Sequence, residues 1–282
     1  MDSRTIVISG GTDGMGRALA LARVAKGDRV IAVGSSVDKG ARLVADAAAS
    51  AGRVEFVRAD LTTVAGTRSV VEAVGRATEV VDALVLFANR VRPRRVETTE
   101  GLESTFALYY LSRYLLSHGL TPALSRSATP VIVNVAGVGV TKGSIQWDDL
   151  QLTRRYSAVA AQLQAGRAND LLGVGYAARH GERVPYVLYH PGFTRSGDLS
   201  TLPRLTRTAI RVAARLFARP VEAAVAPIDG GFLDTPPSEP LTAVDRARHL
   251  PLTLPTLDPD VAARLAGRTE TLLEAVVRSG RK

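Results

Sequence analysis

Short apolar segments alternate with longer Ala- and Leu-rich segments along most of the chain. The apolar segments are rich in β-branched residues, as buried parallel strands are, and lie at 5–9, 29–33, 54–57, 83–88, 130–135 and 185–189. The longer segments predict helices near 14–26, 37–51, 63–78, 99–124, 155–180 and 202–218. This alternation predicts right-handed βαβ crossovers, and therefore an α/β fold with a doubly wound parallel sheet covered by helices on both faces.

The end of the chain continues the pattern less regularly. It predicts a helix near 220–232, a proline-rich turn at Pro236–Pro240 and a closing helix near 258–278. The sequence shows no repeat, low-complexity linker or clear boundary of a second domain. We therefore expect one α/β domain over 1–282, with a core at 4–235 and a small C-terminal extension at 236–282.

A glycine-rich turn joins the first predicted strand to the first predicted helix. It reads Ser9-Gly-Gly-Thr-Asp-Gly-Met-Gly16, with Gly10, Gly14 and Gly16 in the spacing GxxxGxG. Such a turn forms an anion site, because N–H groups and the helix dipole favour negative charge and glycine lets a pyrophosphate approach closely. The alternative is a plain strand–helix turn. Its place at the head of the strand–helix alternation favours the dinucleotide site of a Rossmann-like fold.

Composition narrows the classes of protein to consider. Hydrophobic residues make up 46% of the chain, yet no apolar run reaches the roughly 18 residues that span a bilayer. A strand begins within a few residues of the start, which leaves no room for a signal peptide, so we expect a soluble cytoplasmic protein that binds no membrane. Because the chain has no cysteine and no cluster of metal-ligand residues, we expect neither disulfides nor a metal site.

The chain is basic, with a net charge of +9, and only four of its 36 basic residues are lysines. The arginines are dispersed and aromatic residues make up 5% of the chain, so we attribute the charge to a solvated surface rather than to nucleic-acid binding. One local cluster, Arg90, Arg92, Arg94 and Arg95, follows the fourth predicted strand. This cluster is either an ordinary exposed loop or a binding site for an acidic substrate.

Several motifs resemble those of the short-chain dehydrogenase/reductase family over residues 4–235. The glycine turn resembles the family's TGxxxGIG, and Asp60-Leu61 resembles the pair whose carboxylate meets the adenine amine. Val81–Asn89 lies where the family has its fourth strand and NNAG tetrad, of which Ala88 remains. His190–Thr194 resembles the HPG stretch that lines the nicotinamide. The resemblance implies a dinucleotide cofactor.

The end of the second strand bears on the choice between NADP and NAD. A carboxylate there would accept hydrogen bonds from the adenosine ribose and repel a 2′-phosphate. This chain instead has Ser35 and Ser36, with Lys39 and Arg17 nearby, so we expect NADP in preference to NAD. The alternative is that the serines only cap the next helix. The expected cofactor-binding residues are Gly10, Thr12, Asp13, Gly14, Met15, Gly16, Arg17, Ser35, Ser36, Lys39, Asp60, Leu61, Ala88, Asn89, Pro191, Gly192 and Thr194.

The catalytic positions of the family are altered. The resemblance implies a Tyr-x-x-x-Lys pair in which the tyrosine exchanges a proton and the lysine lowers its pKa. Counting back from the HPG stretch places this pair at Gln162 and Gly166, whereas the alternative register places it at Tyr156 and Ala160. Neither register supplies a lysine.

Two further catalytic positions depart from the family. Ala136-Gly137 stands where the resemblance implies a serine, and Tyr109 stands where it implies an asparagine. Tyr156 and Tyr109 are the candidate proton donors, although a tyrosine without a neighbouring cation keeps a pKa near about 10. Gln162 and Asn134 are further candidates for the catalytic site.

Three hypotheses about function remain open. The first is an atypical NADP(H)-binding reductase or dehydrogenase that acts on a dedicated small carbonyl or alcohol with a substitute proton donor. The second is a non-redox enzyme on the same scaffold, such as a cyclase, isomerase or dehydratase, and the third is a cofactor-binding protein without catalysis. The family resemblance also implies a homodimer or homotetramer through the helices at 99–124 and 155–180.

Overall fold

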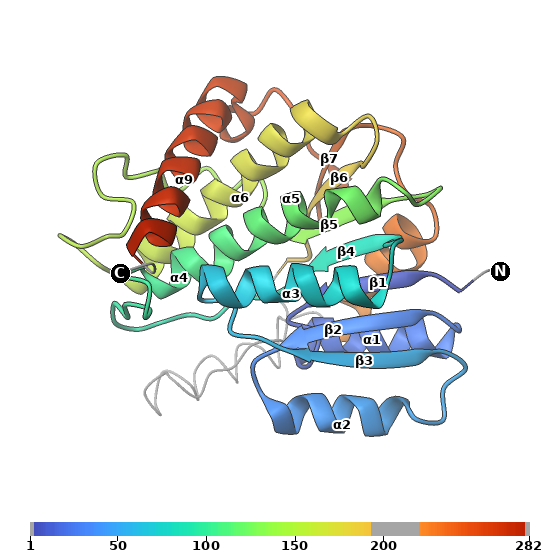
Figure 1. Ribbon diagram of the computed structural model, residues 1–282. Helices are drawn as coiled ribbons and strands as arrows, with labels where there is room; N and C mark the ends of the chain where they lie inside the picture. Colours follow the sequence, from blue (N-terminus) through green and yellow to red (C-terminus); the bar gives the residue numbers. More distant parts are fainter. Residues whose placement is uncertain (1–2, 193–219, 280–282) are drawn as a thin grey trace.

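A computed structural model describes residues 3–192 and 220–279 and has one eight-stranded sheet at its centre (Figure 1). The strand order is β3-β2-β1-β4-β5-β6-β7-β8, and only β8 is antiparallel to its neighbour. The strands are β1 Thr5–Ser9, β2 Arg29–Gly34, β3 Arg53–Arg58, β4 Ala83–Leu86, β5 Val131–Val135, β6 Tyr186–His190, β7 Leu241–Asp245 and β8 Arg248–His249. The predicted doubly wound α/β class is confirmed.

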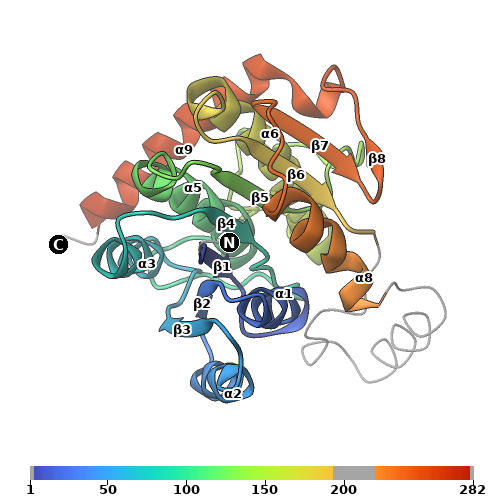
Figure 2. The same cartoon turned by 90° about the vertical axis from the view of Figure 1, so that its right-hand side faces the viewer.

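Helices cover both faces of the sheet, as the end-on view in Figure 2 shows. One face carries α1, α2, α8 and η2, and the other carries α3, α5 and α6 with α9 packed outside them. The helices are α1 Gly14–Ala25, α2 Val37–Ala47, α3 Val64–Ala77, α4 Ser104–Phe106, η1 Ala107–Leu111, α5 Ser112–Leu124, α6 Ala158–His180, α8 Val221–Ala226, η2 Pro227–Leu233, η3 Pro255–Leu257 and α9 Pro259–Ser279.

Alternate residues of every strand except β3 and β8 enter two separate cores. In β1, Ile6 and Ile8 pack toward α1, whereas Val7 packs toward α3 and α5. Successive side chains of a strand point to opposite faces, so a strand covered on both sides needs apolar residues at every position. This requirement explains the unbroken apolar runs from which the strands were predicted.

Six of the eight strands were predicted, each within two residues of its observed ends. The sequence analysis missed β7 and β8, because both are short and follow a proline-rich segment. β7 pairs in parallel with β6, so residues of the expected C-terminal extension complete the sheet. The predicted helix 99–124 begins only at Ser104 and includes the π-helical turn η1. The predicted helix 202–218 lies outside the described residues.

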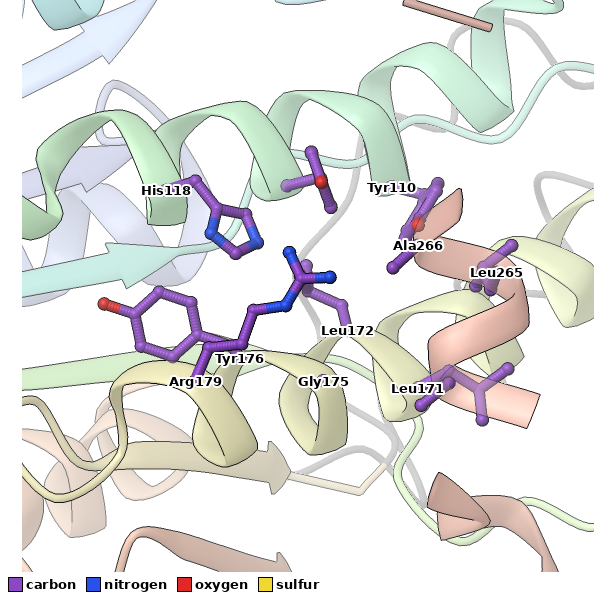
Figure 3. Close-up of a pocket in the computed structure, with 11 residues that line it drawn as sticks. Tyr110, His118, Leu171, Leu172, Gly175, Tyr176, Arg179, Leu265 and Ala266 are labelled. Carbon is purple, nitrogen blue, oxygen red and sulfur yellow. The ribbon is translucent and has the colours of Figure 1, made fainter. Parts of the chain in front are cut away.

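The C-terminal helix α9 closes a small pocket against α5 and α6 (Figure 3). Leu265 of α9 is buried there, and Glu270 pairs with Arg179 of α6 at 3.4 Å. On the other wall, the ring of His118 lies 5.3 Å from the ring of Tyr176, measured between centroids. The helix therefore belongs to the main core. No helix in the described part of the chain is long and apolar enough to cross a membrane.

Candidate cofactor and catalytic site

The glycine turn after β1 packs directly against the end of β4. Gly10 has a φ of +70°, and a Cβ placed there would lie 2.9 Å from the backbone nitrogen of Ala88. A Cβ at Gly16 would lie 2.2 Å from the carbonyl oxygen of Gly10. The turn therefore tolerates no side chain at these two positions, and its backbone closes tightly over the start of α1. This is the geometry that a pyrophosphate site requires.

The first turn of α1 leads into a cleft with a cationic lining. Asp13 caps the helix, since its Oδ1 accepts the Gly14 N–H at 2.8 Å. Thr12 is buried against Gly34 at the end of β2, and Met15 is half-buried. The residues that line the cleft are Thr12, Asp13, Arg17, Lys39, Arg42 and Asp46.

Three cations and two carboxylates share this cleft. Lys39 pairs with Asp13, and Arg17 pairs with Asp46. Arg42 forms no ion pair with a residue in the described ranges, so the cleft keeps a net positive charge. The Ser36 hydroxyl accepts the Lys39 N–H and caps α2, as the alternative explanation of the two serines predicts. Ser35 is exposed.

The remaining residues expected at the nucleotide end lie at the end of β3. Asp60 is exposed, and its Oδ1 accepts hydrogen bonds from the backbone N–H and the hydroxyl of Thr62 at 2.9 and 2.7 Å. Leu61 is buried in the core below. One carboxylate oxygen of Asp60 is therefore engaged in a local turn. The residue itself is exposed to solvent where the chain enters α3.

The N-terminal half of α6 faces the loop that follows β4. Gln162 and Asn89 exchange amide hydrogen bonds of 2.9 and 3.2 Å. Tyr156 precedes α6 and donates its hydroxyl to the carbonyl oxygen of Arg92 at 2.8 Å. Burial raises the pKa of Tyr156. A Cβ at Gly166 would meet nothing within 4 Å, so the face of α6 is open there.

A buried polar network lies beneath this cleft. Asn134 in β5 accepts a hydrogen bond from Arg113 and donates to Asn169 and Tyr186 at 3.0 Å each. Asn134 and Asn169 are fully buried. Asn169 donates to the carbonyl oxygen of Tyr109 at 2.7 Å, which ties α6 to η1. Both polar ends of the Asn134 side chain are therefore occupied within the core.

Tyr109 connects that network to the loop after β5. Its side chain is 8% exposed, and the guanidinium carbon of Arg113 lies 4.6 Å from its ring centroid. Burial raises the pKa of Tyr109, while Arg113 and the backbone N–H of Gly137 act to lower it. The structure thus brings Tyr109 and Asn134 together through Arg113, whereas Gln162 and Tyr156 meet the loop after β4 instead.

The end of β6 forms another border of the site. His190 Nδ1 lies 2.9 Å from Asp245 Oδ1 on the neighbouring strand. Gly192 follows Pro191 and has a φ of +81°. A Cβ placed at Gly192 would lie 3.4 Å from the side chain of Arg246. Thr194, also expected to bind the cofactor, lies outside the described residues. In the described part of the chain, no group of three His, Cys, Asp or Glu residues could hold a metal ion.

The sequence analysis missed three charged residues of the site. Arg42 follows Lys39 by three residues, so both lie on one face of α2. Arg113 is the one charge in the apolar run Phe106–Leu116, a pattern that could have marked a buried cation. Asp170 is 1% exposed, and burial raises its pKa to about 7 although the Gly139 N–H donates to it.

Comparison with known proteins agrees with this geometry. A family model described as short chain dehydrogenase matches residues 4–149. A relative from Streptomyces sp. (strain C5), proposed to be the daunorubicin C-13 ketoreductase DnrU, is 30% identical over 275 residues, which cover 94% of this chain and 91% of the relative. The chain belongs to the short-chain dehydrogenase family.

Solved structures share the fold. A protein of uncharacterised function from Mycobacterium paratuberculosis superposes with a TM-score of 0.70 at 23% identity, covering 96% of this chain and 93% of that one. A protein from Beutenbergia cavernae, described as an NAD(P)-dependent gluconate 5-dehydrogenase with bound NADP, gives 0.64 at 21% identity and covers 88% and 96%. At these identities the likeness concerns the fold alone.

Proposed function

We propose that this member of the family is an NADP(H)-dependent oxidoreductase that acts on a dedicated small carbonyl or alcohol with a substitute proton donor. The observation that carries the proposal is the cationic cleft beside an intact glycine turn. The 10–16 backbone would hold the pyrophosphate, and Arg17, Lys39 and Arg42 would hold the 2′-phosphate. NADPH, when bound, supplies the hydride for carbonyl reduction.

The catalytic end supports a departure from the family's usual chemistry. α6 carries Gln162 and Gly166 where the resemblance implies tyrosine and lysine, and Gly137 follows β5 where it implies serine. Of the two candidate donors, Tyr156 already gives its hydroxyl proton to a backbone carbonyl. Tyr109 faces the amide of Gly137 and is the favoured donor. The Streptomyces relative, proposed to be a ketoreductase, supports a carbonyl substrate.

Calorimetric titration of the full chain with NADPH, NADP and NADH tests the cofactor assignment. We expect NADPH and NADP to bind at least about tenfold more tightly than NADH, because the cleft offers cations and no carboxylate at the end of β2. Equal affinities, or tighter binding of NADH, would contradict the assignment. Binding of no dinucleotide would contradict the proposed function itself.

Restoring the catalytic residues that the family resemblance implies tests the proposed departure from the family's usual chemistry. The variant Gly137→Ser/Gln162→Tyr/Gly166→Lys has room for its new side chains, since a Cβ at Gly166 is free and one at Gly137 meets only Val140 at 3.4 Å. We expect reduction of simple ketones to rise at least about 100-fold over the parent, as general acid catalysis is restored. A folded variant that binds NADPH and stays inactive would favour a scaffold without oxidoreductase geometry.

The proposed assembly is a homodimer or homotetramer through the helices near 99–124 and 155–180. The described structure adds a condition, because α9 packs over α6 and α5 around Leu172 and Gly175. An interface on this side would therefore include α9. Light scattering of the full chain, compared with a variant carrying charges on the outer face of α9, tests whether that helix contributes to the assembly.

A further inference from the structure

We propose that Tyr109 and Arg113 form a relocated tyrosine–cation pair, in which Tyr109 is the proton donor and Arg113 stabilises its anion. The inference rests on the proposed oxidoreductase function. The two residues are spaced Tyr-x-x-x-Arg on the continuous helical run of η1 and α5. This is the spacing of the Tyr-x-x-x-Lys pair that α6 lacks, moved to the preceding helix.

Tyr109 lies beside the position that the missing serine would occupy. The backbone N–H of Gly137, the first glycine after β5, is among the groups that act to lower the pKa of Tyr109, so it lies near the tyrosine hydroxyl. Because Gly137 has no side chain, the space in front of that amide is open to a neighbouring group. The tyrosine hydroxyl can therefore act at the end of β5, where parallel α/β sheets place their ligands.

Arg113 is a buried charge without a counter-ion. It is 0% exposed, and its guanidinium donates to Asn134 Oδ1 and to the carbonyl oxygens of Val135 and Ala88, at 2.9 and 3.1 Å for the two carbonyls. All three acceptors are neutral. Within residues 3–192 and 220–279, no carboxylate pairs with Arg113, and its Nε has no acceptor.

An uncompensated buried cation is costly unless an anion appears beside it. The guanidinium carbon of Arg113 lies 4.6 Å from the centroid of the Tyr109 ring. Tyr109 and Tyr186 are the groups that favour the charge of Arg113. Burial lowers the pKa of Arg113 to about 10, so the side chain stays charged at neutral pH. The Tyr186 hydroxyl accepts a hydrogen bond from the Asn134 side-chain amide and is therefore engaged within the buried polar network. Tyr109 is thus the group whose anion Arg113 is placed to stabilise.

The electrostatic surroundings of Tyr109 come from three elements. Arg113 on α5 and the Gly137 amide after β5 lower its pKa, whereas Asp170 on α6 raises it. Burial also raises it, as expected for a phenol that is the neutral donor at rest. Burial raises the pKa of Asp170 to about 7, so the residue becomes mostly neutral below that pH. A neutral Asp170 would leave Arg113 as the dominant charge beside the phenol.

The step that follows is a carbonyl reduction. NADPH, when bound, would supply a hydride to the carbonyl carbon, so the cofactor would be oxidised and the carbonyl carbon reduced. The Tyr109 O–H bond breaks and its proton bonds to the carbonyl oxygen, giving the alcohol. The tyrosinate that remains lies next to Arg113 until water returns a proton to it.

Carbon-13 NMR of the full chain with labelled tyrosine tests the pair without a substrate. The Tyr109 signal is assigned from Tyr109→Phe. We expect Tyr109 to titrate at least one pH unit below Tyr110, which is also buried but bonds Thr269 and, among the described residues, has no cation that lowers its pKa. We expect Arg113→Gln to raise the Tyr109 pKa by at least one unit and Arg113→Lys to preserve it. Equal titration of Tyr109 and Tyr110 in the parent would overturn the pair, even if Arg113→Gln fails to fold.

Turnover separates the pair from the proposed function. With NADPH and daunorubicin or simple aryl ketones as probes, we expect Tyr109→Phe to lower kcat about 100-fold and to leave NADPH affinity and KM within about twofold. The matched control Tyr110→Phe keeps kcat within about twofold. A parent that turns over a ketone while Tyr109→Phe remains active overturns the inference alone. A parent that binds no NADPH overturns the proposed function, and the NMR result still decides whether the pair exists.

Discussion

The nucleotide half and the catalytic half of the sheet follow different rules. In the first, β1–β3 with α1–α3, the charged residues of the site lie in an open cleft and pair across it, as Lys39 does with Asp13. In the second, β4–β6 with η1, α5 and α6, the ionisable residues Arg113 and Asp170 are buried, and neither forms an ion pair with another residue that the structure describes. The first half is organised by its backbone, whereas the second depends on side chains brought together by three separate elements.

This contrast indicates where each half can change. A backbone cradle fails when one glycine gains a side chain, because the close approach has no alternative. A side-chain network can exchange its members while the fold persists, since the strands that carry it stay unaltered. The glycine turn, together with the proposed departures from the family at positions 137, 162 and 166, would fit this distinction.

The sharpest way to break the comparison is Gly14→Val. Gly14 has a φ of +50° in the first turn of α1, where a β-branched residue is strained and covers the N–H groups. We expect NADPH affinity to fall at least about 1,000-fold, about 4 kcal/mol, in calorimetric titrations. Gly75→Val is the control, because a Cβ at Gly75 in α3 meets nothing within 4 Å. A Gly14→Val protein that binds as its parent does would refute the assignment of the turn.

In the catalytic half, acid should weaken the packing of the helices around His118 and so reduce the contribution of this residue to the unfolding free energy. Burial, with His180 and Arg179 nearby, lowers the pKa of His118 to about 4, although Glu270 opposes this. The unfolded chain therefore binds the proton first, and the His118 contribution is complete above pH 6.5 and lost as the pH falls toward 4. We expect the contribution of His118 to the unfolding free energy to fall by about 2 kcal/mol between pH 7 and pH 5.

Denaturant titrations of the parent and His118→Phe measure this contribution. Asp170 acts in the opposite direction, because its raised pKa of about 7 makes the folded state take up a proton as the pH falls toward 4. Because both proteins contain Asp170, its contribution cancels when the unfolding free energy of one protein is subtracted from that of the other. We expect His118→Phe to gain stability relative to the parent on acidification, whereas replacing the exposed His249 by Gln should change nothing. Parallel stability curves for parent and His118→Phe would contradict the prediction.

A smaller effect sharpens the nucleotide half. Ser35→Asp places a carboxylate at the exposed end of β2. We expect it to weaken NADPH binding and to favour NADH, changing the ratio of affinities about tenfold, or about 1.4 kcal/mol, through repulsion of the 2′-phosphate. Ser35→Asn is the matched control, because it adds the same volume without the charge. If both variants shift the ratio equally, the effect is steric.

The fold could be predicted from the sequence because its pattern is local and repeated. Strands β1, β2, β4, β5 and β6 have both faces covered, which gives largely apolar runs that turns and helices separate. β7 escaped because a five-residue strand next to prolines gains its stability only from pairing with β6. Tertiary pairing of this kind leaves little trace in the local sequence.

The parts of the candidate site that the backbone forms could be predicted from the sequence, whereas the parts that buried side chains form could not. The glycine turn, Arg17 and Lys39 were expected from their places after the first two strands, and the structure brings them to one cleft. Their binding of a cofactor stays a prediction. Arg113 and Asp170 were not found, since their significance arises from burial and from the neighbours that folding supplies. Tyr109 was a candidate on its position alone, and the cation beside it was not foreseen.

The packing of α9 also sets the order in which a newly made chain can finish folding. β7 and the buried residues Leu265 and Leu273 follow strands β1–β6 and helices α5 and α6 in the chain. Until they emerge from the ribosome, the apolar surface around Leu172 has no cover and β6 has an open edge. Nascent chains therefore need protection from aggregation until residues 241–273 have been added, and chaperones that recognise apolar helix faces should bind them before that point.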